Sequence, residues 1–223
     1  LVLVPEQFTM QTQKDLCMAH PRGGIMNIDV LSFERLAFRV LEETGYLCED
    51  VLEETGKSLV IRKVAQNHKK ELSVLGEKMK RQGYISEMKS MVSELRQYEV
   101  SKEDMEKMLE CAKDKPELYY KLKDIAVLYD GFFEYLEGKA ITREEVLEVL
   151  GSVAGKSKKL KESILVLDGY TGFTPIQQNV LEKILPLCEE MYVTVTIGEG
   201  ERPYVQSDAT NLFYLSKQTV SRL

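Results

Sequence analysis

The most informative segment for the fold is Ile164-Leu165-Val166-Leu167-Asp168, an apolar run that ends in a carboxylate. Three further short runs rich in apolar residues occur at 1–4, 26–31 and 191–197. Runs that are apolar on both faces are typical of buried parallel strands. Helical patterns lie between them, over 31–41 and from Thr174-Pro175 onward. This alternation of strand and helix predicts an α/β layer fold.

The middle of the chain, from about residue 49 to residue 150, contains no convincing strand pattern. Helical patterns follow one another there, at 57–66, 83–97, 101–112, 116–136 and 142–150. Ser101 and Thr142 are each followed by acidic residues in the first turn, as at a capped helix start. We therefore expect an inserted all-α subdomain at 49–155, with 1–48 and 156–223 forming the two parts of the α/β core.

Composition limits the classes of function. The chain has 223 residues, and 36 acidic against 30 basic side chains give a net charge of −6, so nucleic acid would be held only by a local basic patch. No apolar run reaches the ~18 residues of a membrane helix, and no signal-peptide pattern opens the chain, so we expect a cytoplasmic protein. The chain starts inside the strand pattern Leu1-Val2-Leu3-Val4-Pro5, which we interpret as a piece of a longer protein.

Residues for metal or nucleophilic chemistry are sparse. Four cysteines are scattered without a Cys-x-x-Cys pair, at positions 17, 48, 111 and 188, and the only histidines are His20 and His68. We expect reduced thiols and no metal site. With only two histidines, the residues needed for a catalytic triad or a zinc-protease motif are almost absent.

One segment, Gly151-Ser152-Val153-Ala154-Gly155-Lys156-Ser157, resembles a phosphate-binding P-loop. It has three residues between its glycines, whereas the motif needs four. A P-loop must also leave a strand and open a helix so that backbone N–H groups meet the phosphates, and here a helical pattern comes first. We interpret the segment as a lysine-rich linker that returns from the insertion to the core.

The strand that ends at Asp168 is similar to the Walker B strand of RecA-like ATPases, in which a carboxylate helps to hold Mg²⁺. Helicases of this kind usually follow that aspartate with a glutamate that activates water, but the next residue here is Gly169. Asp168 is either a residual Mg²⁺ ligand or a polar strand end that caps the next turn, and we favour the second. An ATP site with this sequence would hydrolyse ATP poorly or not at all.

Charge is segregated at the start of the helical region. Residues 42–54 carry six acidic side chains and no basic one, and residues 57–96 carry ten Lys or Arg against four Glu. Two interpretations remain open. These stretches are solvated helix faces, or the second is a basic face that contacts a phosphate backbone.

Three segments taken together resemble one known family. They are Leu3-Val4-Pro5-Glu6-Gln7-Phe8-Thr9, the stretch Val-Leu-Ser-Phe-Glu-Arg-Leu-Ala-Phe-Arg-Val at 30–40, and Asp-Gly-Tyr-Thr-Gly-Phe-Thr-Pro-Ile-Gln at 168–177. Asn211-Leu212-Phe213-Tyr214 fits the same pattern. The set is similar to the N-terminal part of AddB, which belongs to the bacterial AddAB helicase–nuclease. The resemblance implies a RecA-like core with a helical insertion, in a protein that processes double-strand DNA ends for recombinational repair.

The resemblance also implies partners and cofactors. The family carries a P-loop ahead of the first strand and a nuclease domain with an iron–sulfur cluster near its C-terminus, and neither is in this chain. ATP, Mg²⁺ and the cluster are therefore implied for the full-length protein and not for this piece. The implied partners are the AddA subunit and single- and double-stranded DNA. In the family, this region guides one strand and recognises the Chi sequence.

The family pattern also suggests a DNA-binding site. Single-stranded DNA is held by aromatic faces that stack on bases and by cations or amides that bind phosphates and base edges. The matching residues follow the first two strands, where α/β sheets place ligands: Gln7, Thr9, Phe33, Arg35 and Phe38. Phe173 and Thr174, after the third strand, are weaker candidates. Phe33 and Phe38 lie about 140° apart around a helix, so one of them could belong to the core.

Two other functions remain open. The chain could be part of an active superfamily 1 helicase motor, which would need an upstream P-loop and measurable ATP turnover. Alternatively, the helical subdomain could be a docking surface for AddA. In that case DNA binding would not depend on Phe33 and Arg35, whereas assembly with AddA would depend on the insertion.

Overall fold

The computed structural model describes residues 1–46, 51–205 and 207–222. The chain divides into two compact units: unit 1 contains Leu1–Leu47 and Val146–Leu223, and unit 2 contains Cys48–Glu145. The predicted boundary at residue 48 lies outside the described residues. The predicted boundary at 155 lies later than the observed division, which falls inside helix α7 (Arg143–Val153).

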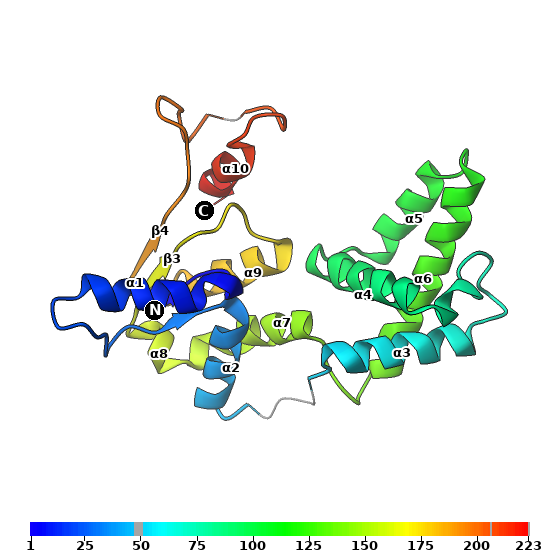
Figure 1. The fold of residues 1–223 in the computed structure, drawn as a ribbon, viewed down its shortest axis with the longest axis horizontal. Helices are drawn as coiled ribbons and strands as arrows, with labels where there is room; N and C mark the ends of the chain where they lie inside the picture. Colours follow the sequence, from blue (N-terminus) through cyan, green and yellow to red (C-terminus); the bar gives the residue numbers. More distant parts are fainter. Residues whose placement is uncertain (47–50, 206, 223) are drawn as a thin grey trace. The chain divides into compact units, whose positions relative to one another are not determined.

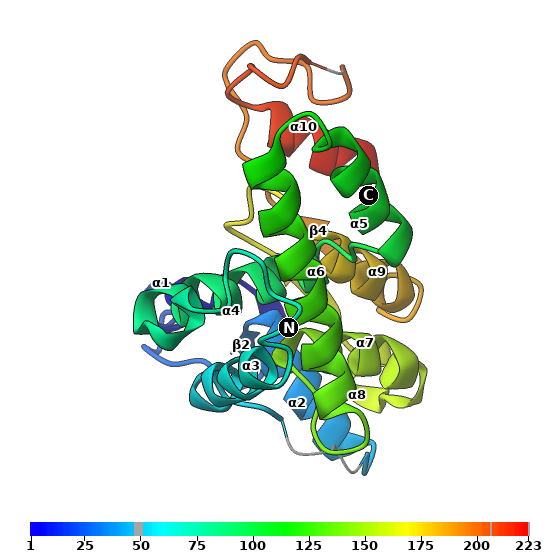
Figure 2. The ribbon, with the colours of Figure 1, turned by 90° about the vertical axis from the view of Figure 1, so that its right-hand side faces the viewer.

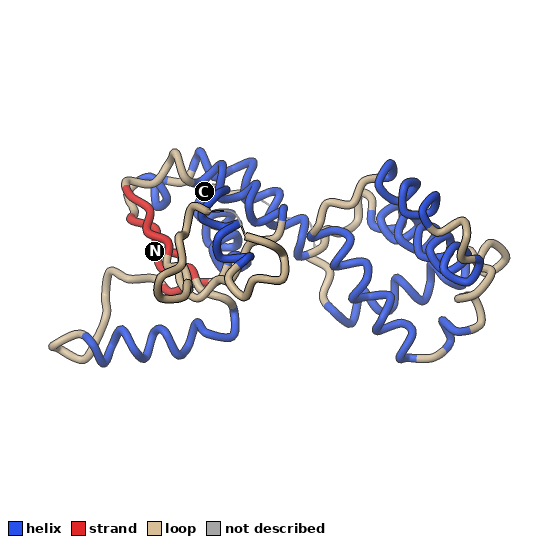
Figure 3. Tube along the Cα trace, turned by 90° about the horizontal axis from the view of Figure 1, so that it is seen from above, coloured by secondary structure: helices blue, strands red, loops and turns tan. Residues whose placement is uncertain are grey.

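Unit 1 is built on a parallel sheet. Within the described residues this sheet has four strands in the order β2-β1-β3-β4, and all neighbours are parallel. The strands are β1 (Val2–Leu3), β2 (Val30–Leu31), β3 (Ile164–Leu167) and β4 (Glu190–Val193). Figure 3 shows the strands gathered together in unit 1, while unit 2 consists of helices and loops. The predicted α/β class is confirmed, and the RecA-like subtype stays a prediction.

Unit 1 also contains helices, most of which are labelled in Figure 1. They are η1 (Glu6–Phe8), α1 (Thr9–Ala19), α2 (Phe33–Glu43), η3 (Ala154–Lys156), α8 (Lys158–Lys161), α9 (Pro175–Ile184) and α10 (Tyr214–Arg222). Ser32 caps α2 because its Oγ accepts from the Arg35 backbone N–H at 3.3 Å. Thr174 and Gln177 form a capping box at the start of α9, with Pro175 in its first turn. Both helix starts agree with the sequence pattern.

The glycine- and lysine-rich segment 151–157 forms part of a helical connection. It passes through the end of α7 and through η3, and Ser157 is the N-cap of α8. The Glu43 carboxylate accepts hydrogen bonds from the Ser157 hydroxyl and from the backbone N–H groups of Lys158 (2.9 Å) and Lys159 (3.0 Å). The segment therefore has the geometry of a linker, and its helix N-terminus already holds a carboxylate of the chain itself.

Unit 2 is built from helices joined by loops. Its helices are α3 (Glu54–Asn67), η2 (Lys78–Lys80), α4 (Gln82–Gln97), α5 (Lys102–Cys111), α6 (Pro116–Leu136) and the start of α7. Figure 2 shows α5 beside the long helix α6. Gly131 of α6 allows close packing on α3, because a Cβ there would lie 2.8 Å from Val64 Cγ1. A single parallel bridge between Val51 and Ile141 joins the two ends of the described part of the unit.

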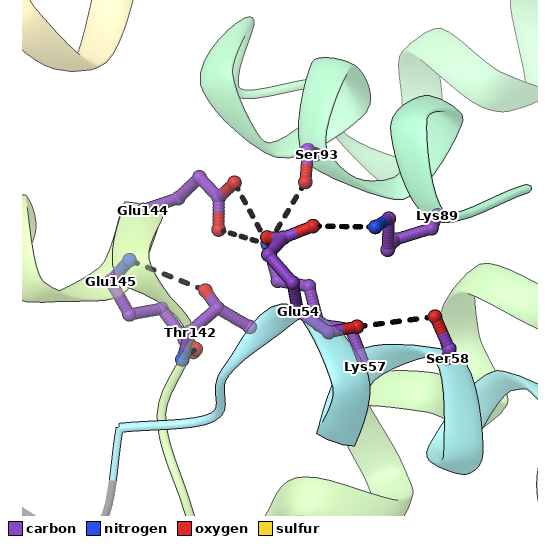
Figure 4. Close-up of polar contacts among 8 residues, drawn as sticks. All are labelled: Glu54, Lys57, Ser58, Lys89, Ser93, Thr142, Glu144 and Glu145. Carbon is purple, nitrogen blue, oxygen red and sulfur yellow. Dashed lines mark hydrogen bonds and ion pairs between the residues drawn. The ribbon is translucent and has the colours of Figure 1, made fainter. Parts of the chain in front are cut away.

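Two buried charged side chains tie the helices of unit 2 together. Lys57 of α3 is 1% exposed and donates to Glu144 and to Ser93, as Figure 4 shows. Asp124 of α6 is fully buried and accepts three backbone N–H groups of the loop after α3, from residues 73, 74 and 75. Such charges remain buried because hydrogen bonds compensate for their lost hydration.

Much of the positive charge in 57–96 is engaged within the chain. Among the described residues, five of the ten basic side chains lie within 4.0 Å of a carboxylate: Lys57, Lys69, Lys80, Lys89 and Arg96. A phosphate-binding face in this stretch would therefore depend on the other basic side chains. In the part of the chain that the structure describes, no helix is both long and apolar enough to span a bilayer.

Candidate nucleic-acid interface

The segments that follow β1, β2 and β3 meet at one edge of the sheet, because parallel strands bring their carboxyl ends together. We call this edge, residues 5–9, 32–38 and 168–174, the carboxyl edge. Contacts connect the three segments. A Cβ on Gly169 would lie 3.6 Å from Pro5 and 3.9 Å from Phe8, and the Arg35 side chain reaches Glu6. The topology therefore brings the candidate residues into one region, as the strand order predicts.

The predicted aromatic residues separate into buried and exposed ones. Phe33 is 4% exposed, and its ring packs edge-on against Tyr170 (5.6 Å between centroids) and Phe173 (6.1 Å). Phe38 is 39% exposed on the other side of α2. The separation of about 140° around the helix thus divides the two rings. Phe33 is a core residue, and a base could stack on it only if the ring became uncovered. Phe38 offers an accessible ring as it stands.

The predicted polar residues also differ in access. Gln7 is exposed on η1, whereas Thr9 is buried and its hydroxyl donates to the Glu6 carbonyl oxygen at 3.0 Å. Thr174 acts as the cap of α9, as described above. The Arg35 side chain is 55% exposed, and its Nε and Nη2 lie 3.1 and 2.9 Å from Glu6 Oε1. Gln7 and Arg35 are thus available to a ligand, while Thr9 and Thr174 stabilise helix starts.

Asp168 has the environment of a polar strand end. Its backbone N–H donates to the Leu3 carbonyl at 2.9 Å, and its carboxylate accepts from the Thr194 hydroxyl. Gly169 has a φ of +76°, a conformation in which any side chain is strained, so a water-activating glutamate does not suit this position. The Asp168 carboxylate thus bonds to the residue after β4 and not to the turn after β3, and its role stays a prediction.

The side chains that commonly bind metal ions are dispersed through the described residues. Across 1–46, 51–205 and 207–222, no three His, Cys, Asp or Glu side chains lie close enough to share a metal ion. Cys17, Cys111 and Cys188 are free thiols, and Cys48 lies outside the described residues. An iron–sulfur site built from such ligands is therefore not found among these residues, whereas a Mg²⁺ ion held by one carboxylate and by nucleotide phosphates would not need a group of three.

Three further residues at the carboxyl edge were not among the predicted site residues. Phe8 is 46% exposed beside Gly169, Glu6 pairs with Arg35, and Tyr170 joins Phe33 and Phe173 in an aromatic cluster. Burial, together with the nearby Glu6 charge, raises the pKa of Tyr170, so its hydroxyl stays protonated at neutral pH. All three lie inside the quoted motifs, but only the observed turn geometry shows which of them face solvent.

The chain therefore belongs to the class of α/β proteins that have a parallel sheet, a helical insertion and a polar carboxyl edge. Its residues 1–223 match the model of the family described as "ADDB, N-terminal", and the chain belongs to that family. It is 45% identical over its whole length to the AddB-type subunit of the ATP-dependent helicase/deoxyribonuclease of Lachnoclostridium phytofermentans, and 35% identical to that of Caldanaerobacter subterraneus subsp. tengcongensis. The chain spans 19% of the length of each of these relatives.

Proposed function

We propose that this chain is the helicase-like N-terminal part of an AddB-type protein and that its carboxyl edge guides single-stranded DNA. One observation carries the proposal: Gln7, Arg35 and Phe38 are accessible in segments that follow two adjacent parallel strands. An amide, a guanidinium and an aromatic ring are the chemical groups that bind base edges, phosphates and base faces.

The wider role is supported by the family resemblance of the sequence motifs and by the relatives, which are named helicase/deoxyribonuclease subunits. We propose that the full-length protein acts with an AddA subunit in the cytoplasm, processes double-strand DNA ends for recombinational repair, and recognises Chi. ATP, Mg²⁺ and an iron–sulfur cluster would be bound outside the described residues. The conformation of Gly169 supports the proposal that this chain does not hydrolyse ATP by itself.

Each accessible group has a separate task in this proposal. Arg35 neutralises one phosphate, Phe38 stacks on one base, and the Gln7 amide donates to and accepts from a base edge. Since few phosphates are neutralised, the strand is held weakly enough to pass along the edge. Sequence preference then arises at the base edge and the stacking contact.

Fluorescence anisotropy of a labelled single-stranded oligonucleotide, titrated with this chain at two salt concentrations, tests the proposal. A stacked base is worth about 1–3 kcal/mol, so Phe38→Ala should weaken binding at least about fivefold. Arg35→Ala should weaken it and also lower the salt dependence by about 0.7 in log–log slope. Arg39→Ala removes an arginine of the same helix that pairs with Asp29, before β2, and should have little effect. Equal effects of Arg35→Ala and Arg39→Ala would contradict the proposal.

A second candidate function belongs to unit 2. A cavity of about 750 Å³ lies between the end of α4, α5 and α6. Tyr129 and Phe133 are among its aromatic lining residues, and its acidic lining includes Glu106, Asp130, Glu134 and Glu137. No hydrogen bond or ion pair to these four carboxylates is formed within the described residues. Negative charge around an aromatic surface repels DNA and suits a basic protein surface, which favours docking of AddA at unit 2.

A further inference from the structure

We propose that Glu6 competes with the DNA phosphate for Arg35 and thereby sets how selectively the carboxyl edge holds a strand. This inference rests on the proposed function. Glu6 belongs to η1, directly after β1, and Arg35 belongs to the first turn of α2, directly after β2. The pairing of Leu3 with Leu31 places these two turns beside each other.

The backbone on both sides of this contact is fixed, while the side-chain ends are accessible. The Glu6 carbonyl accepts from the buried Thr9 hydroxyl, and the Arg35 N–H donates to the Ser32 cap. The two side chains are each 55% exposed, and both guanidinium contacts, at 2.9 and 3.1 Å, go to the same carboxylate oxygen. The ion pair can therefore open by side-chain rotation alone, without unfolding either turn.

A carboxylate and a phosphodiester are rival acceptors for one guanidinium. When a phosphate takes Arg35, Glu6 loses its partner and is left beside a second anion. Glu6 therefore lowers the affinity for the DNA phosphate in two ways, through the lost ion pair and through the new repulsion. An exposed ion pair is too weak to exclude a phosphate, but it reduces the affinity by a factor of about two to ten.

This competition favours selective over general retention of DNA. With Glu6 in place the pair carries no net charge, so a phosphate alone gains little at the edge. A strand that also stacks on Phe38 and bonds to Gln7 gains enough to displace the carboxylate. Glu6 thus lowers the affinity for every strand by the same factor, so that at a given DNA concentration only strands with these additional contacts stay bound, and it acts without contacting a base.

The test compares Glu6→Gln with the wild-type chain in the anisotropy titration. Glu6→Gln should tighten binding about three- to tenfold at low salt and less at high salt, because exposed charges are screened. The log–log salt dependence should become only slightly steeper, by less than the about 0.7 that one phosphate contact contributes, because Arg35 contacts a single phosphate with or without Glu6. Asp29→Asn is the control: it removes one acidic charge that pairs with another arginine of α2, Arg39, at 3.2 Å, and with Lys159 at 2.6 Å.

The double variant Glu6→Gln/Arg35→Ala separates competition for Arg35 from a general charge effect. In the Arg35→Ala background, Glu6→Gln should increase the affinity for the oligonucleotide no more than the Asp29→Asn control does. If the gain persists there, or if Glu6→Gln alone only matches the control, the competition is disproved while the proposed function stands. If Arg35→Ala leaves binding unchanged, or a folded chain binds no oligonucleotide, the proposed function and the inference both fail. Circular dichroism verifies that each variant is folded.

Discussion

The buried ion pair in unit 2 gives a stability prediction that the structure specifies closely. The Lys57 ammonium donates to Glu144 Oε1 (3.1 Å), Glu144 Oε2 (3.0 Å) and Ser93 Oγ (2.9 Å), as Figure 4 shows. Its donors are thus satisfied although the side chain is 1% exposed. The perturbations are Lys57→Met, Glu144→Gln and the double variant Lys57→Met/Glu144→Leu.

Removing one member of such a pair leaves the other charge buried, which costs about 3–5 kcal/mol in the free energy of unfolding. We expect the lower end, about 3 kcal/mol, for Glu144→Gln, because Glu54 lies 4.0 Å from the Lys57 ammonium and compensates part of the lost charge. Replacing both members by apolar groups removes both desolvation penalties. The double variant should therefore lie within about 1 kcal/mol of the wild-type chain.

The pair also predicts how stability depends on pH. Burial of Glu144 raises its pKa. The Lys57 charge and hydrogen bonds from the backbone, Lys57 and Ser93 lower the pKa by more than burial raises it, so the net pKa lies below 4.5. A lowered pKa means that the stabilisation is fully present above 4.5 and is lost as the pH falls through the folded-state pKa. The cost of Glu144→Gln should accordingly shrink below pH 4.5.

The assay is urea unfolding followed by circular dichroism at 222 nm, at pH 7 and at pH values below 4.5. Because the chain has two units, two transitions are fitted where the curves require them. Lys89→Met is the control, since this partly exposed lysine pairs with Glu54 at the surface and should cost less than about 1 kcal/mol. Single variants no more costly than the control, or a double variant that loses the sum of both, would refute the reasoning.

Two further predictions concern unit 2. Asp124→Asn should lower the free energy of unfolding by about 2–3 kcal/mol, because an amide NH₂ would face one of the three backbone donors. Asp130→Asn on the same helix is the exposed control, and urea unfolding measures both variants. If unit 2 docks AddA, Glu134→Lys/Glu137→Lys should weaken assembly with an AddA subunit about tenfold or more in an interferometry assay, without weakening oligonucleotide binding. Unchanged assembly would contradict the docking interpretation.

The helices of unit 2 could be predicted because local signals mark both their ends. The predicted helix at 116–136 coincides with α6: Pro116 opens it, and Gly138, at φ +66°, follows its end. Ser101 and Thr142 cap α5 and α7 as expected, and the Asp104 and Glu145 carboxylates accept from the backbone N–H groups of these two cap residues. These signals depend on neighbours within four residues, so a single sequence contains them.

Other elements could not be predicted because their signals are weak or non-local. Helix α1 buries only Thr9, so it has no apolar face for a periodicity argument to detect. The predicted strand at 26–31 is longer than β2, because only Val30 and Leu31 pair with β1, and Met26 is 97% exposed. Strand length is set by the partner strand, which is remote in sequence.

The same distinction explains the candidate site. Helical geometry alone separated Phe33 from Phe38, and parallel topology alone placed Gln7 and Arg35 at one edge. The Glu6–Arg35 contact, between residues 29 apart, depends in addition on the register that pairs Leu3 with Leu31. A shift of one residue in that register would move every side chain of the short strand to the other face. Whether the Arg35 guanidinium is paired with a carboxylate is therefore determined by strand pairing, and a list of basic residues in the sequence does not reveal it.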